Sequence, residues 1–220
     1  MATMTFSSLT QDLKDWMEND GTEFSNETSG FISLAEQRIA RDVDPYAFHE
    51  SANSSFNVGD RFVSKPVDAK IIFHFLLIDS DSKRVFLEKR TDEYIYDYWP
   101  NSSSTGTPKY WANYTDTGIL VAPTPSAALN IEMTYSRRIA ELSSSNTTNW
   151  LTQNAQDLLL YACLMEASTF TKSREDYAIY AQRYKESVEA VNNQARRRRR
   201  DDFTAPANVM GENYLKQMST

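Results

Sequence analysis

The sequence predicts an α+β protein: a helical bundle of two N-terminal and two C-terminal helices, with an inserted small antiparallel β domain and an extended C-terminal tail. Apolar residues recur at helical spacing near both ends of the chain. In the middle, apolar and polar residues alternate as they do along strands, and after residue 200 all periodicity is lost. The predicted boundaries are 1–44 and 141–200 for the helical body, 45–140 for the β domain and 201–220 for the tail.

Two amphipathic helices are expected before residue 44, over 7–18 and 28–43. Ser7 or Ser8 is expected to cap the first helix, and Gly21 is expected to end it in the left-handed conformation that glycine adopts at low cost. The apolar residues that define the two helical faces are Leu9, Leu13 and Trp16 in the first and Phe31, Leu34, Ala35 and Ile39 in the second.

The middle of the chain is rich in β-branched and aromatic residues bounded by turn residues, which predicts a set of short strands. Tyr94, Tyr96 and Tyr98 alternate as side chains on one face of a strand would. Pro123 and Pro125 favour an extended turn. The expected strands are 62–67, 69–78, 85–89, 109–114, 118–121 and 128–135, and together they indicate a mostly antiparallel β domain.

Two more helices are expected at the C-terminal end. The first has apolar residues around so much of its circumference that it should be buried, with Cys163 acting as a small hydrophobic residue. Ser173 and Asp176 resemble a capping box that begins the last helix, over 174–200. The apolar positions of the buried helix are Leu151, Ala155, Leu158, Ala162 and Met165.

Composition excludes several classes of function. The six glycines among 220 residues are too far apart for a dinucleotide-binding turn or a P-loop. One cysteine and two distant histidines give neither a disulfide framework nor a zinc-binding spacing. The longest apolar stretch, Ile71–Ile78, is too short to span a membrane. The sequence therefore predicts no enzyme activity, no cofactor, no metal and no membrane partner.

Charge is unevenly distributed along the chain. The net charge is −7, yet residues 1–195 carry −10 and Arg196–Arg200 form an unbroken cationic run. A duplex-DNA-binding protein usually spreads positive charge along a face. The pattern instead favours a protein that stays off DNA but holds one anionic partner at a defined place.

Several segments, in order and spacing, match one known family. They are Phe31–Val43, Pro108–Trp111, Leu120–Pro125, Leu129–Tyr135, Asn149–Ala167 and Tyr180–Lys185. The chain resembles bacteriophage head–tail adaptor (connector) proteins over roughly 6–44 and 108–195. The resemblance does not extend to 46–105 or to the tail.

The resemblance implies a structural virion protein that assembles as a ring, usually of twelve copies, beneath the portal of the capsid. Such a ring extends the DNA channel through which the genome is ejected, and it provides the attachment surface for a tail, nozzle or neck protein. Genomic DNA would pass through without sequence-specific binding. The expected location is the head–tail junction of the virion, after assembly in the host cytoplasm.

In several such families the C-terminal segment docks onto the portal, so the arginine run and the apolar tail residues are candidate partner-binding residues. The run could instead contact a neighbouring subunit, line the channel against DNA phosphates, or be a solvated helix end. The tail could order on binding or be an unstructured terminus. The candidate residues are Arg196, Arg197, Arg198, Arg199, Arg200, Phe203, Val209, Met210, Tyr214 and Leu215.

A band of aromatic residues is a second candidate surface. Aromatic side chains often anchor subunit or tail interfaces, but they also build the core of a β domain, and the sequence leaves both open. The candidates are Tyr94, Tyr96, Tyr98, Trp99, Tyr110 and Trp111. An alternative function is a DNA-binding or packaging accessory protein that grips DNA with Arg196–Arg200.

Overall fold

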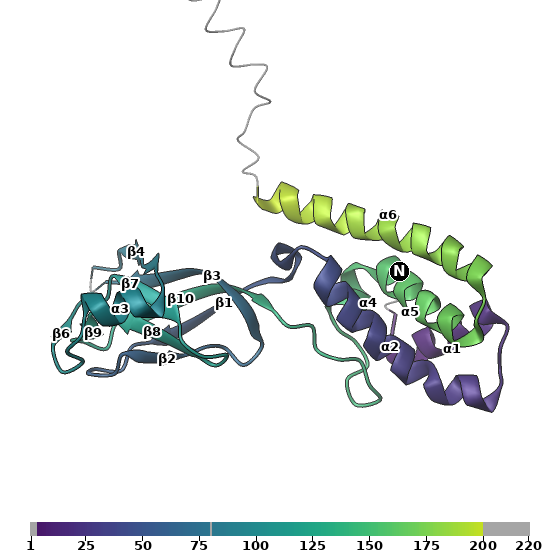
Figure 1. Cartoon of the computed structure of the whole chain (residues 1–220), viewed down its shortest axis with the longest axis horizontal. Coiled ribbons are helices and arrows are strands. Elements are labelled where there is room, and N and C mark those ends of the chain that lie inside the picture. The colour runs from purple at the N-terminus through teal and green to yellow at the C-terminus, as the bar shows by residue number, and fades with distance from the viewer. Residues whose placement is uncertain (1–3, 80, 200–220) are drawn as a thin grey trace, which may run out of the picture. The chain divides into compact units, whose positions relative to one another are not determined.

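The computed structural model describes residues 4–79 and 81–199, and the chain divides into two compact units (Figure 1). The helical unit combines the N-terminal segment up to Ala47 with the chain from Ile139 onward, and the β unit spans Phe48–Arg138. Helices and antiparallel sheets are both present, which confirms the predicted α+β class.

The helical unit is built around one apolar helix, α5, which packs against α1, α2, α4 and α6. Its central residues, including Leu158, Cys163 and Leu164, are completely buried, as the apolar circumference predicted. Figure 1 shows α6 lying along α5. The helices are α1 (Phe6–Met17), α2 (Thr22–Asp42), α4 (Trp150–Asn154), α5 (Gln156–Thr171) and α6 (Arg174–Arg199), with a 3-10 turn, η1 (Pro45–Phe48).

The N-terminal helix boundaries differ from the prediction. Thr5 caps α1, because its Oγ1 accepts the N–H of Ser8 at 3.1 Å while Ser8 Oγ accepts the N–H of Thr5 at 2.9 Å. The prediction that Gly21 ends α1 was wrong: Glu18 adopts the left-handed conformation with φ 46°, and Gly21 instead precedes α2. α2 begins before its expected start because the buried side chains of Phe24 and Thr28 extend its apolar face.

The C-terminal helices are separated by side-chain caps and a left-handed residue. Asn149 Oδ1 accepts the N–H groups of Leu151 and Thr152, which begins α4. Ala155 separates α4 from α5, and Lys172, with φ 60°, ends α5. Ser173 caps α6, since its Oγ accepts the N–H of Asp176 and donates to the Asp176 carboxylate at 2.6 Å. The other half of the predicted capping box is not formed, because the Ser173 N–H donates to the Ser168 carbonyl.

The β unit contains two four-stranded sheets, one ordered β1-β10-β3-β4 and the other β2-β8-β7-β5. All strand pairs in these sheets are antiparallel except β5 with β7, and β6 and β9 form a further parallel pair. The strands are β1 (His49–Ser55), β2 (Phe62–Ser64), β3 (Ala69–Ile78), β4 (Arg84–Phe86), β5 (Glu88–Lys89), β6 (Thr105–Gly106), β7 (Tyr110–Asn113), β8 (Gly118–Ala122), β9 (Thr124–Pro125) and β10 (Asn130–Arg137).

The core of the β unit takes side chains from both four-stranded sheets, including Phe75 of β3, Trp111 of β7 and Met133 of β10. Ile119 and Val121 of β8 belong to this core, whereas Leu120 and Ala122 form a second cluster with Ile95 of helix α3 (Asp92–Tyr98). Both faces of β8 are therefore covered, which explains why its sequence is a continuous apolar run.

The segment that contains Tyr94, Tyr96 and Tyr98 is a helix, so the expected strand-like alternation was wrong. Thr91 caps α3 by accepting the N–H of Tyr94, and acidic residues occupy the first turn, where they interact favourably with the helix dipole. Ile95 is its one buried side chain. A helix this short carries too few residues for its period to be told from that of a strand.

Candidate functional site

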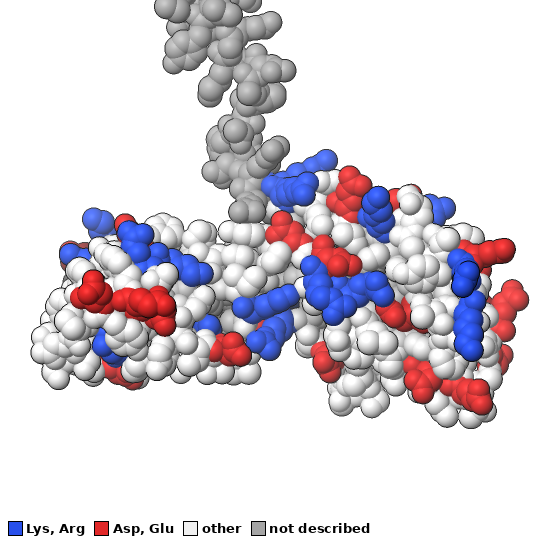
Figure 2. Space-filling view, viewed as in Figure 1, with Lys and Arg blue, Asp and Glu red and all other residues white. Residues whose placement is uncertain are grey.

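The first candidate surface is the C-terminal end of α6, where the predicted arginine run begins. The side chains of Arg196 and Arg197 are exposed. Figure 2 shows cationic side chains gathered at this end of the helix. The side chains of Arg198 and Arg199 lie outside the described part of the chain, as do Arg200, Phe203, Val209, Met210, Tyr214 and Leu215, so their roles stay predictions.

Contacts with the end of α2 position this part of α6. The Tyr184 hydroxyl donates to Asp42 Oδ2 at 2.9 Å, and burial together with this hydrogen bond raises the pKa of Tyr184. About two helical turns further along α6, Asn192 Oδ1 accepts the N–H of Asp44 at 2.7 Å. These bonds, with buried Val191 and Ala195, hold α6 against the helical unit up to the residue before the arginines.

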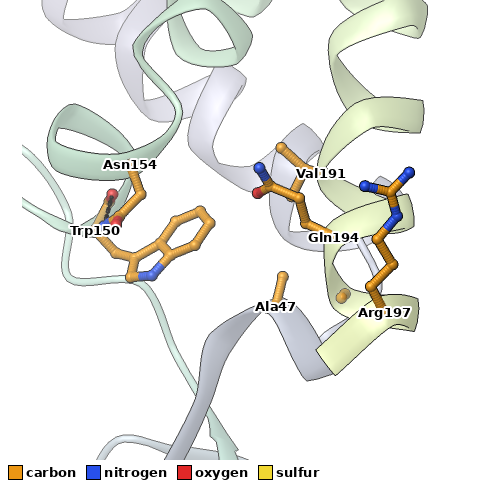
Figure 3. Close-up of a pocket in the computed structure, with 7 residues that line it drawn as sticks. Ala47, Trp150, Asn154, Val191, Gln194 and Arg197 are labelled. Carbon is orange, nitrogen blue, oxygen red and sulfur yellow. Dashed lines mark hydrogen bonds between the residues drawn. The ribbon is translucent and has the colours of Figure 1, made fainter. Parts of the chain in front are cut away.

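A hollow of about 530 Å³ lies beside the same end of α6 (Figure 3). The Trp150 indole extends from α4 toward α6, and Arg197 lies on the α6 side of the hollow. The sequence did not reveal this hollow, because its walls come from separate segments. The lining residues are Ala47, Trp150, Asn154, Val191, Gln194, Ala195 and Arg197.

The second candidate surface lies on the β unit and is formed by aromatic residues of α3 and β7. Tyr94 and Tyr98, one helical turn apart, stack with centroids 6.0 Å apart and an interplanar angle of 5°. Tyr110 contacts both rings edge-on, at 5.5 and 4.9 Å, and Trp99 lies 6.1 Å from Tyr98. Tyr94 and Tyr98 are about two-fifths exposed, so this cluster is a surface rather than a core.

Two arginines that the sequence did not single out complete the aromatic surface. Arg90 lies 5.5 Å from the Tyr94 ring and 5.7 Å from the Tyr110 ring, and it pairs with Glu88 at 2.5 Å. Arg61 is buried, lies 5.3 Å from the exposed Tyr96 ring and donates to the Trp99 carbonyl at 3.1 Å. These cation–π contacts stabilise the arrangement of the tyrosine rings.

Trp111 does not belong to this surface, contrary to its place among the interface candidates. Only 1% of its area is exposed, and its ring contacts Phe75 edge-on at 5.9 Å within the core of the β unit. Its indole N–H donates to the Leu87 carbonyl at 3.2 Å, and Lys89 lies over the ring. Residues alternate faces along β7, so Tyr110 points outward where Trp111 points inward.

Glu36 is the most perturbed carboxyl group of the helical unit. Its side chain is 5% exposed, and burial raises its pKa to about 7. Glu36 Oε1 accepts hydrogen bonds from Asn149 Nδ2 at 2.7 Å and the Leu142 N–H at 3.2 Å. Both partners belong to the segment that leads back from the β unit, so this carboxyl group has a structural position rather than an open catalytic one.

The described residues do not present a metal centre. Over 4–79 and 81–199, no three His, Cys, Asp or Glu side chains come together in a way that could hold a metal ion. Cys163 is completely buried, and burial raises the pKa of its thiol well above the ordinary value, which disfavours the reactive thiolate. Among the same residues, every helix is too short or too polar to cross a membrane.

Comparison with known proteins gives one family match. The family model described as SU10 adaptor protein matches residues 4–210, which includes nearly all of both units. No curated protein matches the chain.

Proposed function

Because the chain belongs to the SU10 adaptor protein family, we propose that it is a structural component of a bacteriophage virion that forms the adaptor ring between head and tail. Copies of the chain pack side by side beneath the portal, extend the DNA channel and offer a surface to the next tail, nozzle or neck protein. The observation that carries this proposal is the family match over 4–210, which spans the helical and β units alike.

Packing between copies is assigned to the helical unit. Several large apolar side chains of this unit remain exposed in the single chain, and such side chains often become buried when subunits associate. Trp16 and Leu34 are each about half exposed, and Ile179 of α6 is 59% exposed. A ring requires that two different faces of each copy fit together, and exposed apolar groups on α1, α2 and α6 supply candidates for both.

Portal binding is assigned to the end of α6 and the residues that follow it. Arginine pairs with carboxylates through two parallel hydrogen bonds, so a run of five suits an acidic groove on a partner. Repetition around a ring turns each run into part of a cationic belt. The tail would then be anchored to the portal by its apolar side chains, those of Phe203, Val209, Met210, Tyr214 and Leu215.

The aromatic surface of the β unit is assigned to a tail-side partner or a neighbouring copy. Tyr94, Tyr98 and Tyr110 are already held in one arrangement by mutual contacts and by Arg90. Tyrosine and tryptophan are enriched among residues that dominate binding energy, and rings held in advance lose little entropy on binding.

Native mass spectrometry of the purified chain, alone and with purified portal, tests the proposed function. The expected result is a complex of portal with multiple copies of the chain. A chain that stays monomeric and unbound with the portal present would argue strongly against an adaptor ring.

A second function, DNA binding by Arg196–Arg200, is favoured by the exposure of Arg196 and Arg197. If five arginines neutralise phosphates, the logarithm of the DNA affinity should fall with the logarithm of salt concentration with a slope of about −4.5. Fluorescence anisotropy with a labelled duplex at several salt concentrations measures that slope. This function would be favoured if replacement of the five arginines by alanine abolished DNA binding together with its salt dependence.

A further inference from the structure

The hollow beside Trp150 is large enough to hold a side chain, and its lining is mixed, with more polar than apolar surface. Its volume of about 530 Å³ lies within the range typical of ligand sites. Trp150, Val191 and Ala195 supply apolar surface, while Asn154 and Gln194 supply polar groups at the exposed rim. The lining lies wholly within the helical unit, so the hollow is formed by a single compact body.

We propose that in the free chain, before it meets the portal, this hollow binds the start of the chain's own C-terminal segment, with the Phe203 side chain seated against the Trp150 indole. Phe203 is the first large apolar residue after the arginine run. An aromatic pair of this kind contributes about 0.5–1.5 kcal/mol beyond the apolar area that it buries. The proposed occupant is therefore the segment that directly follows α6, and α6 forms one wall of the hollow.

The length of the chain permits this return. Ala195 lies in the wall of the hollow, and α6 ends at Arg199, which at 1.5 Å per residue is about 6 Å further along the helix axis. The four residues from Arg200 to Phe203 can span about 13 Å when extended. Phe203 can therefore come back along α6 to the level of Ala195 and still reach sideways into the hollow.

The charges favour the same return. Arg197 forms part of the α6 wall, and Arg196 beside it is also exposed. Asp201 and Asp202 immediately precede Phe203, so a reversed chain brings carboxylates to the cationic rim as the phenyl ring enters. A segment joined to its site by a few residues has an effective concentration in the millimolar range, which favours a seat on the same copy over one on another copy.

Disulfide trapping in the full chain tests this seat. The variant carries Asn154→Cys and Thr204→Cys, so Phe203 itself stays in place. Asn154 is exposed at the rim, and native Cys163 is buried. A disulfide requires Cα atoms within about 7 Å, so it reports the seated segment. In dilute protein with a glutathione buffer, the pair should form a disulfide within the monomer, seen as a mobility change in non-reducing electrophoresis.

The matched control adds Phe203→Ala to the same two cysteines, so the length of chain between them is unchanged. The pair should close about tenfold faster with Phe203 present than in the control, because only then is the neighbouring cysteine held at the site. Equal rates in the two proteins would overturn the proposal. A product found only as a covalent dimer would also overturn it, since the occupant would then be a segment of a second copy.

A measurement without introduced cysteines gives an independent check. In the full chain, Phe203→Ala should shift the Trp150 indole N–H resonance in a ¹H–¹⁵N spectrum, whereas Leu215→Ala should leave it in place. An unchanged Trp150 resonance in the Phe203→Ala protein would contradict the proposed seat. This inference is independent of ring formation, so its failure would leave the adaptor function standing.

Discussion

Glu36 joins three parts of the helical unit through one buried carboxyl group. It lies on α2, accepts the Leu142 N–H of the returning segment, and accepts Asn149 Nδ2 from the residue that caps α4. Burial, with a smaller contribution from nearby Glu141, raises its pKa to about 7, although both hydrogen bonds oppose that rise. The carboxyl group therefore holds a proton below neutral pH in the folded chain.

Glu36→Gln should remove a pH dependence of stability. In the unfolded chain the carboxyl ionises near pH 4.5, so between pH 4.5 and 7 the folded state holds an extra proton and stability falls as pH rises. Relative to the wild type, the glutamine variant should gain about 3 kcal/mol in the free energy of unfolding from pH 4 to pH 8. Urea denaturation across this range measures it.

Glu27→Gln, which replaces an exposed carboxyl group on the same helix, is the matched control. Comparison of the two variants separates the loss of a buried carboxyl group from the loss of a surface charge. If the difference in the free energy of unfolding between Glu36→Gln and the wild type did not change with pH, the buried carboxyl group would not titrate in this range.

Truncation of Trp111 should destabilise the β unit far more than truncation of Tyr98, because Trp111 lies in a core and Tyr98 lies on a surface. Trp111→Ala should lower the free energy of unfolding of the β unit by about 3–5 kcal/mol. Tyr98→Ala should change it by about 1 kcal/mol or less, since the ring is 39% exposed. Thermal denaturation of both variants checks this, and a mild effect of Trp111→Ala would contradict the core assignment.

The residue pattern could not have separated these aromatic residues before the fold was known. Tyr94, Tyr96 and Tyr98 alternate in sequence as strand residues do, yet α3 places Tyr94 and Tyr98 on one side through helical spacing. The exposure of a tyrosine depends on what covers β7, and that cover is α3 itself. The arginines at the surface, Arg61 and Arg90, are brought to the rings only by the tertiary fold.

At the scale of elements, the long helices and the longest strands were the most predictable features. β3 occupies the expected residues 69–78, and α5 is buried as its apolar circumference predicted. β1 was not predicted, because its sequence, HESANSS, is polar and its ladder with β10 depends on backbone hydrogen bonds at a sheet edge. The start of a helix was harder to predict, because neighbouring hydroxyl residues can each act as the N-cap. At α1 the cap is Thr5 and not Ser7 or Ser8.

The docking of α6 onto α2 makes a prediction at the same scale. Tyr184→Phe removes the hydrogen bond to Asp42 Oδ2 but keeps the ring, so the free energy of unfolding should fall by about 1–2 kcal/mol. Tyr177→Phe on the exposed side of α6 is the control and should have little effect. Chemical denaturation compares them, and equal stabilities for the two variants would remove this bond as an anchor of α6.

At the scale of the whole molecule, the helical and β units offer different surfaces, and the adaptor role assigns a partner to each. In the proposed ring, repetition would place many copies of each surface side by side. The family membership extends over both units, whereas the resemblance in sequence alone did not include 46–105. Those residues hold much of the β unit, where short strands carry little distinctive sequence.

The cationic end of α6 makes a prediction about assembly. Replacement of Arg196–Arg200 by five glutamines should weaken portal binding by at least about tenfold, because each lost ion pair to a partner carboxylate costs binding energy. The control for total charge removes five exposed positive charges from the β unit by replacement with glutamine, at Lys70, Lys83, Arg84, Lys89 and Lys109. Surface plasmon resonance on immobilised portal measures both, and equal affinities would exclude the arginine run from the interface.

Cryo-electron microscopy of the purified chain mixed with portal tests the adaptor role most directly. The account predicts a closed ring of many copies on one end of the portal, coaxial with its channel, with the helical units in contact with each other. Images of bare portal beside free single chains, or of the chain bound at any place other than the channel axis, would contradict it.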